Sequence, residues 1–229
     1  MNSDGLKRLL GGVSPKALLA GVMVACFLVS IPIWLTSSPE DKQHLAQTAV
    51  KKMVETNVDL LDFKPEEKEE LRNMLKPEEP AKQPDFEQTV WVKDIIQTIQ
   101  PWVSDESEAE AIARWVYVYS KRSNLSPELV LGVIAVESRF DHFAVSNVGA
   151  IGLMQVMPFW KDELGQQKDN LLEIETNIRY GCAILRIYIN RYKTLSRALG
   201  AYNGSLGRMK YPNKVFAAMK RFKATDYGI

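Results

Sequence analysis

Cysteine and histidine are scarce in this chain of 229 residues, which has two of each. So few ligands leave no structural zinc cluster, and we expect no metal site and no cofactor. Lys and Arg number 29 against 28 Asp and Glu, a formal net charge of +1, so the positive excess of a dedicated nucleic-acid binder is missing. Long polar–apolar alternation and internal repeats are also absent from the sequence, which leaves a mainly α protein.

An uncharged segment lies near the N-terminus. No Asp, Glu, Lys, Arg or His occurs from Ala17 to Pro39, and residues 17–35 are almost all apolar. As a helix rising ~1.5 Å per residue, 17–35 would cross about the ~30 Å of hydrocarbon in a bilayer. Three basic residues precede it. The positive-inside rule therefore predicts a cytoplasmic tail at 1–16, a transmembrane anchor at 17–35 and the remaining chain on the far side.

Two other fates of this segment stay open. It resembles a cleaved signal peptide, although the apolar core of such a peptide is usually only ~7–15 residues long. Val24-Ala25-Cys26 also loosely resembles a bacterial lipobox, in which Cys26 would carry lipid. Against lipidation, Met23 stands where Leu is most common and the apolar run continues to Leu35. The other cysteine, Cys182, lies in an apolar helical pattern and is predicted to be a free core thiol.

Residues 36–86 are mostly polar and are predicted to form a stalk or spacer. Thin apolar stripes predict helices at 40–57 and 65–75, and three prolines between Pro77 and Pro84 block any continuation. Packing of this segment on the following domain, or binding of a partner, remain alternatives.

From residue 87 to 229 the sequence is helical in pattern and denser in apolar residues. Steps of three and four residues between apolar side chains predict helices at 88–102, 105–122, 127–138, 171–192, 194–203 and 212–222. A Gly-rich piece from Ser146 to Gly152 predicts a short hairpin or loop. We therefore expect one mainly α domain over 87–229.

Glu137 is the residue most suggestive of chemistry. Ser126-Pro127 is a good helix start, which places Glu137 in the last turn, above Val133 and Ile134. Desolvation by this apolar face and the negative end of the helix dipole both disfavour the charged form, so both should raise its pKa toward neutrality. The alternative is a surface glutamate paired with Arg139.

Three motifs follow one another in this domain, and they read Glu137-Ser138, Gly152-Leu153-Met154-Gln155 and Ala201-Tyr202-Asn203-Gly204. In this order they resemble the hallmark blocks of family 1 lytic transglycosylases, the SLT-type enzymes that cleave bacterial cell-wall glycan. Asn177 and Gly181 also match the family helix after the second block. The resemblance covers roughly residues 105–229. It implies a lysozyme-like α-helical catalytic domain with a short hairpin or loop region.

Two positions depart from or only loosely match the family pattern. The third block usually continues with Ala and Gly, whereas Gly204 and Ser205 follow Asn203 here. The family also has a tyrosine before a helix, with Val four residues on, for which Tyr211 and Val215 are the best match.

The resemblance implies cleavage of the β-1,4 bond between N-acetylmuramic acid and N-acetylglucosamine without water. Most glycosidases use two carboxylates, but Asp141 and Glu128 have no evident reason to face the same bond. In the family, the substrate's own acetamido oxygen assists a single glutamate. Glu137 would protonate the leaving oxygen and then accept the C6 hydroxyl proton, which gives a 1,6-anhydro end. A lysozyme-type hydrolase, and a non-catalytic glycan-binding subunit of a secretion or pilus apparatus, are the alternatives.

The resemblance also implies substrate contacts for polar motif residues, each with a structural alternative. Ser138, Gln155 and Asn203 would hydrogen-bond the sugar, or else nearby backbone. Met154 would pack on a pyranose face, or belong to the core.

Tyrosines and glycines of the motifs complete the expected site. Tyr202 would orient Glu137 or the acetamido group, or be a core tyrosine, and Tyr211 is expected to contact substrate. Gly149, Gly152 and Gly204 are expected in loops that need positive φ or close approach to sugar.

The predicted anchor, the segment 36–86 and the resemblance together imply a location and partners. We expect a single-pass protein of the inner membrane with a periplasmic catalytic domain, peptidoglycan strands as partner, and cell-wall or secretion-machinery proteins bound through 36–86. Residues 171–229 contain 11 Lys and Arg against 3 Asp and Glu. Such a region would attract the carboxylates of peptidoglycan stem peptides, unless it is only a set of solvated helix faces.

Overall fold

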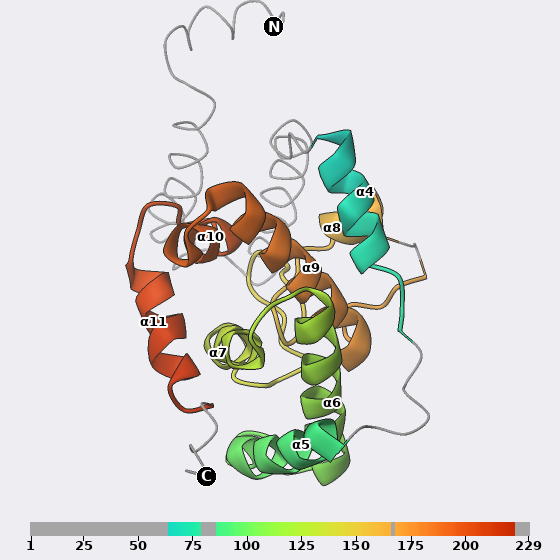
Figure 1. Ribbon diagram of the computed structural model, residues 1–229, viewed down its shortest axis with the longest axis vertical. Coiled ribbons are helices and arrows are strands. Elements are labelled where there is room, and N and C mark those ends of the chain that lie inside the picture. Colours follow the sequence, from blue (N-terminus) through green and yellow to red (C-terminus); the bar gives the residue numbers. More distant parts are fainter. Residues whose placement is uncertain (1–63, 79–85, 166–167, 223–229) are drawn as a thin grey trace, which may run out of the picture.

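The computed structural model of the chain describes residues 64–78, 86–165 and 168–222, which form helices joined by loops (Figure 1). The helices are α4 (Pro65–Met74), α5 (Phe86–Ile99), α6 (Glu106–Arg122), α7 (Pro127–Glu137), α8 (Phe159–Leu164), α9 (Ile174–Tyr192), α10 (Leu195–Tyr202) and α11 (Lys210–Met219). These described ranges contain no strand, and two isolated antiparallel bridges join Val145 to Ile151 and Ile151 to Val156. The mainly α prediction is confirmed.

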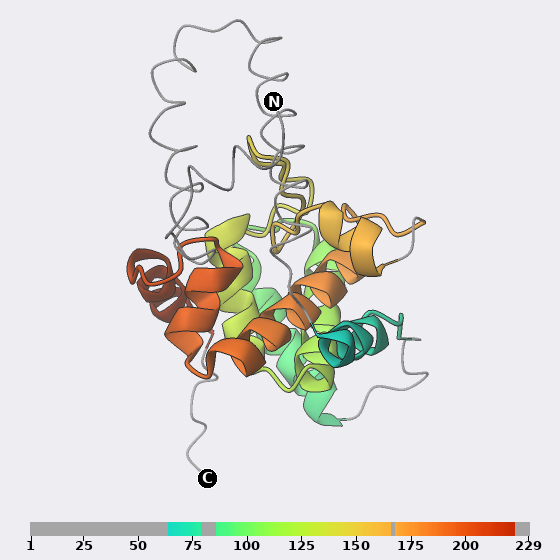
Figure 2. The same cartoon turned by 90° about the horizontal axis from the view of Figure 1, so that it is seen from above.

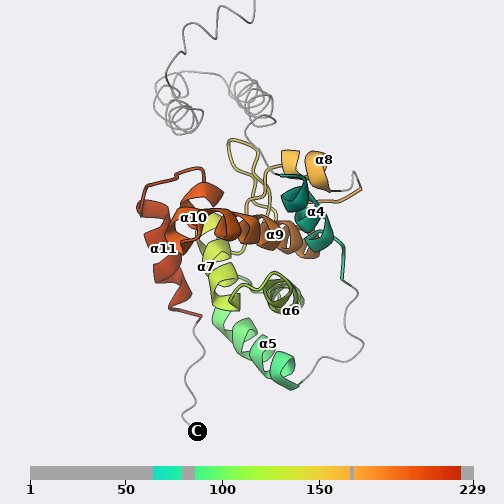
Figure 3. The ribbon, with the colours of Figure 1, turned by 45° about the horizontal axis from the view of Figure 1, so that its top comes forward.

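The long helix α9 lies at the centre of the domain. It crosses the middle of the view in Figure 3, with α7, α10 and α11 toward one end and α4 and α8 toward the other. Residues 176–185 of α9 are all buried, as a helix surrounded by neighbours requires. Cys182 is among them as a free, buried thiol, so its predicted role is confirmed.

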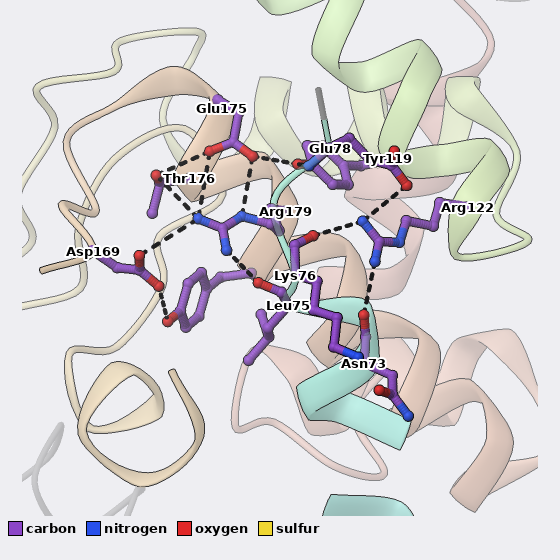
Figure 4. Close-up of polar contacts among 11 residues, drawn as sticks. Asn73, Leu75, Lys76, Glu78, Tyr119, Arg122, Asp169, Glu175, Thr176 and Arg179 are labelled. Carbon is purple, nitrogen blue, oxygen red and sulfur yellow. Dashed lines mark hydrogen bonds and ion pairs between the residues drawn. The ribbon is translucent and has the colours of Figure 1, made fainter. Parts of the chain in front are cut away.

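The segment 64–78 packs on the domain through α9 and α6. Leu71 is fully buried in the core. The carbonyl oxygens at the end of α4 accept hydrogen bonds from two arginines (Figure 4). Arg122 donates to the carbonyl oxygens of Asn73 at 2.7 Å and Lys76 at 2.6 Å, and Arg179 donates to that of Leu75. Cationic donors at a helix C-terminus complement its dipole. This part of the predicted stalk therefore adopts the packing alternative.

Arg179 is the buried centre of this contact. Its side chain is 2% exposed and lies 3.1 Å from a Glu175 oxygen and 3.7 Å from an Asp169 oxygen. Glu175 in turn accepts a hydrogen bond from Tyr119, whose hydroxyl oxygen accepts from the Glu78 amide at 3.0 Å. The network thus joins α6, α9 and the residues after α4 (Figure 4).

Helix boundaries agree closely with the sequence pattern, with one exception. The helix α8 was not predicted, because it has six residues and so gives too few turns for a periodic signal. Within the described ranges, no helix has both the length and the apolarity needed to cross a bilayer. The predicted tail at 1–16, the predicted anchor at 17–35 and the predicted helix at 40–57 lie outside those ranges.

Candidate active site

Glu137 is the last residue of α7, and local sequence dictates where that helix begins. The Ser126 hydroxyl oxygen accepts a hydrogen bond from the Leu129 amide at 3.2 Å, and Pro127 takes the first helical position. All residues from Leu129 to Ile134 are buried. The core therefore fixes α7, and α7 holds the Glu137 carboxyl group at a defined place.

Two side chains from the C-terminal helices reach this carboxyl group. Tyr211 of α11 donates its hydroxyl proton to Oε1 of Glu137 at 2.6 Å, and the Asn203 side chain also hydrogen-bonds the carboxyl group. Burial raises the pKa of Glu137 to about 7, although these two hydrogen bonds act in the opposite direction. A carboxylic acid with this pKa can both give and accept a proton near neutral pH.

The environment of Glu137 differs from that of a surface glutamate. Among the described residues, Arg139 does not contribute to its pKa, and neither does any carboxylate. The alternative of a surface pair with Arg139 is therefore not what the structure shows. Burial also raises the pKa of Tyr211 well above its ordinary value, with the nearby Glu137 charge as a second cause. Tyr211 thus stays protonated and acts as a hydrogen-bond donor to Glu137.

The backbone turns sharply just after Glu137. Arg139 and Phe140 have φ of +56° and +68°, in the left-handed region that non-glycine residues rarely adopt. The Phe140 ring is buried near Trp102 and Phe222, with ring centroids 5.6 and 5.9 Å away. Removing such a ring from water contributes ~1.5–3 kcal/mol, which stabilises the turn. The turn ends α7 at Glu137 and leads into the Gly-rich loop.

Asn177 of α9 holds the loop of the second motif, which extends from the helices on the side where α8 lies (Figure 2). Its side chain accepts a hydrogen bond from the Met154 amide at 2.8 Å and donates to the carbonyl oxygens of Ile151 and Leu171 at 2.8 and 2.7 Å. Gly152 has φ of +74°, and a Cβ atom there would lie 2.3 Å from the Asn177 amide nitrogen. Only glycine therefore fits at position 152.

The third motif is bonded to the second. Tyr202 of α10 donates its hydroxyl proton to the Met154 carbonyl oxygen at 2.8 Å, and not to Glu137. The Met154 side chain is fully buried and lies so close to α9 that a Cβ atom on Gly181 would be 2.3 Å from its sulfur. Gly149 and Gly204 have φ of +84° and +68°.

The structure thus brings Glu137, Asn203 and Tyr211 together at one carboxyl group. Gln155 donates through its amide nitrogen to the carbonyl oxygens of Ala144 and Gly152 at 3.1 and 3.0 Å. Ser138 donates through its hydroxyl to the Ile134 carbonyl oxygen at 3.3 Å. Ser138 and Gln155 thus bond nearby backbone and Met154 belongs to the core, which are the structural alternatives that the sequence left open for these residues. The roles of these three residues at a sugar stay predictions.

The supporting residues around the site escaped sequence reasoning. Trp102 and Phe222, which bury Phe140, lie far from the motifs in the chain and belong to no motif. Their aromatic character is the one sequence signal that could have indicated a place in the core. In the described part of the chain, no group of three or more His, Cys, Asp or Glu is placed to hold a metal ion.

In comparisons with known proteins, residues 115–223 match the family model of the Transglycosylase SLT domain. A protein named transglycosylase from Enterobacteria phage PRD1 is 39% identical over 103 residues, which cover 42% of this chain and 38% of the phage protein. Membrane-bound lytic murein transglycosylase C of Glaesserella parasuis serovar 5 (strain SH0165) is 33% identical over 126 residues, covering 47% of this chain and 35% of that protein.

Residues 115–223 are therefore similar to the domain of SLT-type transglycosylases. Glu137, Asn203 and Tyr211 all lie within the matched range. The matches span well under half the length of these two relatives.

Proposed function

We propose that this chain is a lytic transglycosylase of peptidoglycan in which Glu137 serves as the single acid and base. One observation carries the proposal: a half-buried carboxyl group with a pKa of about 7 receives hydrogen bonds from Tyr211 and Asn203 within an SLT-type domain. The relative from G. parasuis is named a lytic murein transglycosylase, which supports the same substrate.

In the proposed reaction, the Glu137 proton moves to the glycosidic oxygen as the bond between that oxygen and C1 of N-acetylmuramic acid breaks. The acetamido oxygen of the same sugar stabilises the positive charge at C1. Tyr211 and Asn203 favour the carboxylate that Glu137 has become, because both hydrogen bonds lower its pKa. The carboxylate then takes the proton of the C6 hydroxyl group, and the oxygen of that hydroxyl group bonds to C1. Glu137 is thereby reprotonated, and water is not consumed.

The electrostatics of the site favour this reaction over hydrolysis by two carboxylates. Glycosidases of the two-carboxylate type place the groups ~5–9.5 Å apart, where one charge would act on the pKa of the other. In the described part of the chain, the pKa of Glu137 responds to burial, Tyr211 and Asn203 and to no carboxylate. This supports a mechanism with a single glutamate.

Location is the second part of the proposal. The G. parasuis relative is named membrane-bound, and residues 17–35 of this chain are almost all apolar and uncharged. We place the anchor at 17–35 in the inner membrane and the domain in the periplasm, with lipid on Cys26 as the competing mode of attachment. Cell-wall or secretion-machinery proteins remain the proposed partners of the rest of 36–86.

Clearing of purified peptidoglycan by the full chain in detergent tests the proposal. Glu137→Gln should reduce the rate by at least ~100-fold, because the amide cannot transfer a proton. Glu110→Gln is the matched control, since Glu110 is on the surface with a side chain that is 50% exposed. A folded Glu137→Gln protein that clears at the wild-type rate would remove Glu137 from the mechanism.

A further inference from the structure

The stretch from Asn203 to Tyr211 has both of its ends beside Glu137, because the Asn203 and Tyr211 side chains hydrogen-bond the Glu137 carboxyl group. Hydrogen bonds within the backbone order this stretch. The Ser205 amide donates to the Gly200 carbonyl oxygen at 2.6 Å, and the Arg208 amide donates to the Ser205 carbonyl oxygen at 2.9 Å. A substrate bound at Glu137 therefore lies beside an ordered turn.

Three exposed cations follow this turn into α11, namely Arg208, Lys210 and Lys214, here called the basic lip. Lys210 directly precedes Tyr211, and the Cα atom of Arg208 lies at most about 11 Å from that of Tyr211, at ~3.6 Å per residue. Long side chains at these positions are within reach of groups attached to a glycan at Glu137.

No ion pair among the described residues neutralises the charge of the basic lip. Within the described ranges, none of its three members forms an ion pair, whereas Arg114, Lys121, Arg122, Arg179 and Arg191 all pair with carboxylates. The sequence has no Asp or Glu from 176 to 225. A surface of one sign beside a reaction centre attracts ligands of the opposite sign.

Apolar side chains accompany the cations. Leu206 and Met209, in the same turn, are 38% and 50% exposed. Exposed apolar groups interleaved with cations suit a ligand that carries both methyl groups and carboxylates, which describes a peptide better than a bare sugar.

We propose that the basic lip binds the carboxylates of the peptide stems attached to the glycan, and so makes the chain selective for stems whose carboxylates are free. This inference rests on the proposed function, because it takes peptidoglycan as the substrate at Glu137. It adds a determinant of specificity that lies outside the three motifs.

Binding of the full chain, in detergent, to insoluble peptidoglycan tests the inference. Two forms of the polymer are compared: native peptidoglycan, and the same material with its carboxylates converted to primary amides. The lip variant is Arg208→Gln/Lys210→Gln/Lys214→Gln. The control variant, Arg72→Gln/Lys76→Gln/Lys93→Gln, removes the same charge from exposed positions on α4, just after it, and on α5.

Wild type and the control variant should bind native peptidoglycan at least about threefold more tightly than the amidated form. This ratio is the lower end of the affinity gain expected from three exposed ion pairs. The lip variant should bind both forms equally, and added salt should remove the wild-type preference. Equal binding of both forms by wild type would overturn the inference. So would a control variant that loses the preference as fully as the lip variant.

Failure of the inference and failure of the proposed function give different results. Binding requires no cleavage, so a chain that prefers native peptidoglycan but never cleaves it contradicts only the proposed function. A chain that cleaves native and amidated peptidoglycan with the same kcat/KM contradicts only the inference.

Discussion

Replacing Glu137 by Gln should stabilise the folded protein while it abolishes activity. Burial raises the pKa of Glu137 from 4.5 to about 7, so above pH 7 the folded state holds a charge that the interior disfavours. Each pKa unit corresponds to 1.36 kcal/mol, and the raised pKa therefore costs at most about 3 kcal/mol of folding free energy at pH 8. A neutral amide keeps the size and can still accept the Tyr211 hydrogen bond.

The sign of this effect depends on pH. Below pH 4.5 the carboxyl group is protonated in both the folded and unfolded states, so Glu137→Gln should then change stability little. As pH rises from 4.5 to about 7, the wild type loses stability relative to the variant, and above this range the difference stays constant.

Denaturant unfolding of both proteins at pH 4 and pH 8 measures the effect. The expected gain for Glu137→Gln is about 1–3 kcal/mol at pH 8 and close to zero at pH 4. Glu110→Gln should show no gain at pH 8, because its side chain is on the surface. A Glu137→Gln protein that is less stable than wild type at pH 8, or equally stabilised at both values, would refute the burial argument.

Three further predictions concern Tyr211, Arg179 and Cys26. Tyr211→Phe removes a hydrogen bond that lowers the pKa of Glu137, so the fall of activity at high pH should move to higher pH; an unchanged pH–rate profile would contradict this role. Arg179→Ala removes the cation beside Asp169 and Glu175 and should cost about 3–5 kcal/mol in denaturant unfolding, whereas the exposed Arg72→Ala should cost little. Cys26→Ser should leave the mass and membrane attachment of the protein unchanged if 17–35 is a retained anchor, and an accumulated uncut precursor would show lipidation instead.

Local signals predicted the elements that hold Glu137, but not the contacts that shape its surroundings. Ser126-Pro127 determines the start of α7 through a cap and a fixed φ, and both act over a few residues. The three- and four-residue steps between apolar side chains predicted a helix at 171–192, where α9 lies, for the same reason. The convergence of Asn203 and Tyr211 on Glu137 joins segments separated by 66 and 74 residues. The family resemblance suggested only that both residues contact substrate, and it assigned the contact with Glu137 to Tyr202.

The docking of α4 shows what the sequence alone could not reveal. The apolar stripe of 65–75 is thin, so its pattern fitted a free stalk as well as a packed helix. What distinguishes them is Arg179, which lies 104 residues after the Leu75 carbonyl oxygen that it binds. An arginine in a helical pattern is usually exposed, and no local rule marks this one as buried.

The chemical form of the product tests the central claim most directly. Purified peptidoglycan is digested with the full chain, and the soluble fragments are analysed by mass spectrometry against a lysozyme digest of the same material. A single acid and base with acetamido assistance predicts 1,6-anhydro-N-acetylmuramic acid ends, each lighter by one water than the reducing ends of the hydrolysed standard. Reducing ends alone would contradict the account and point to hydrolysis.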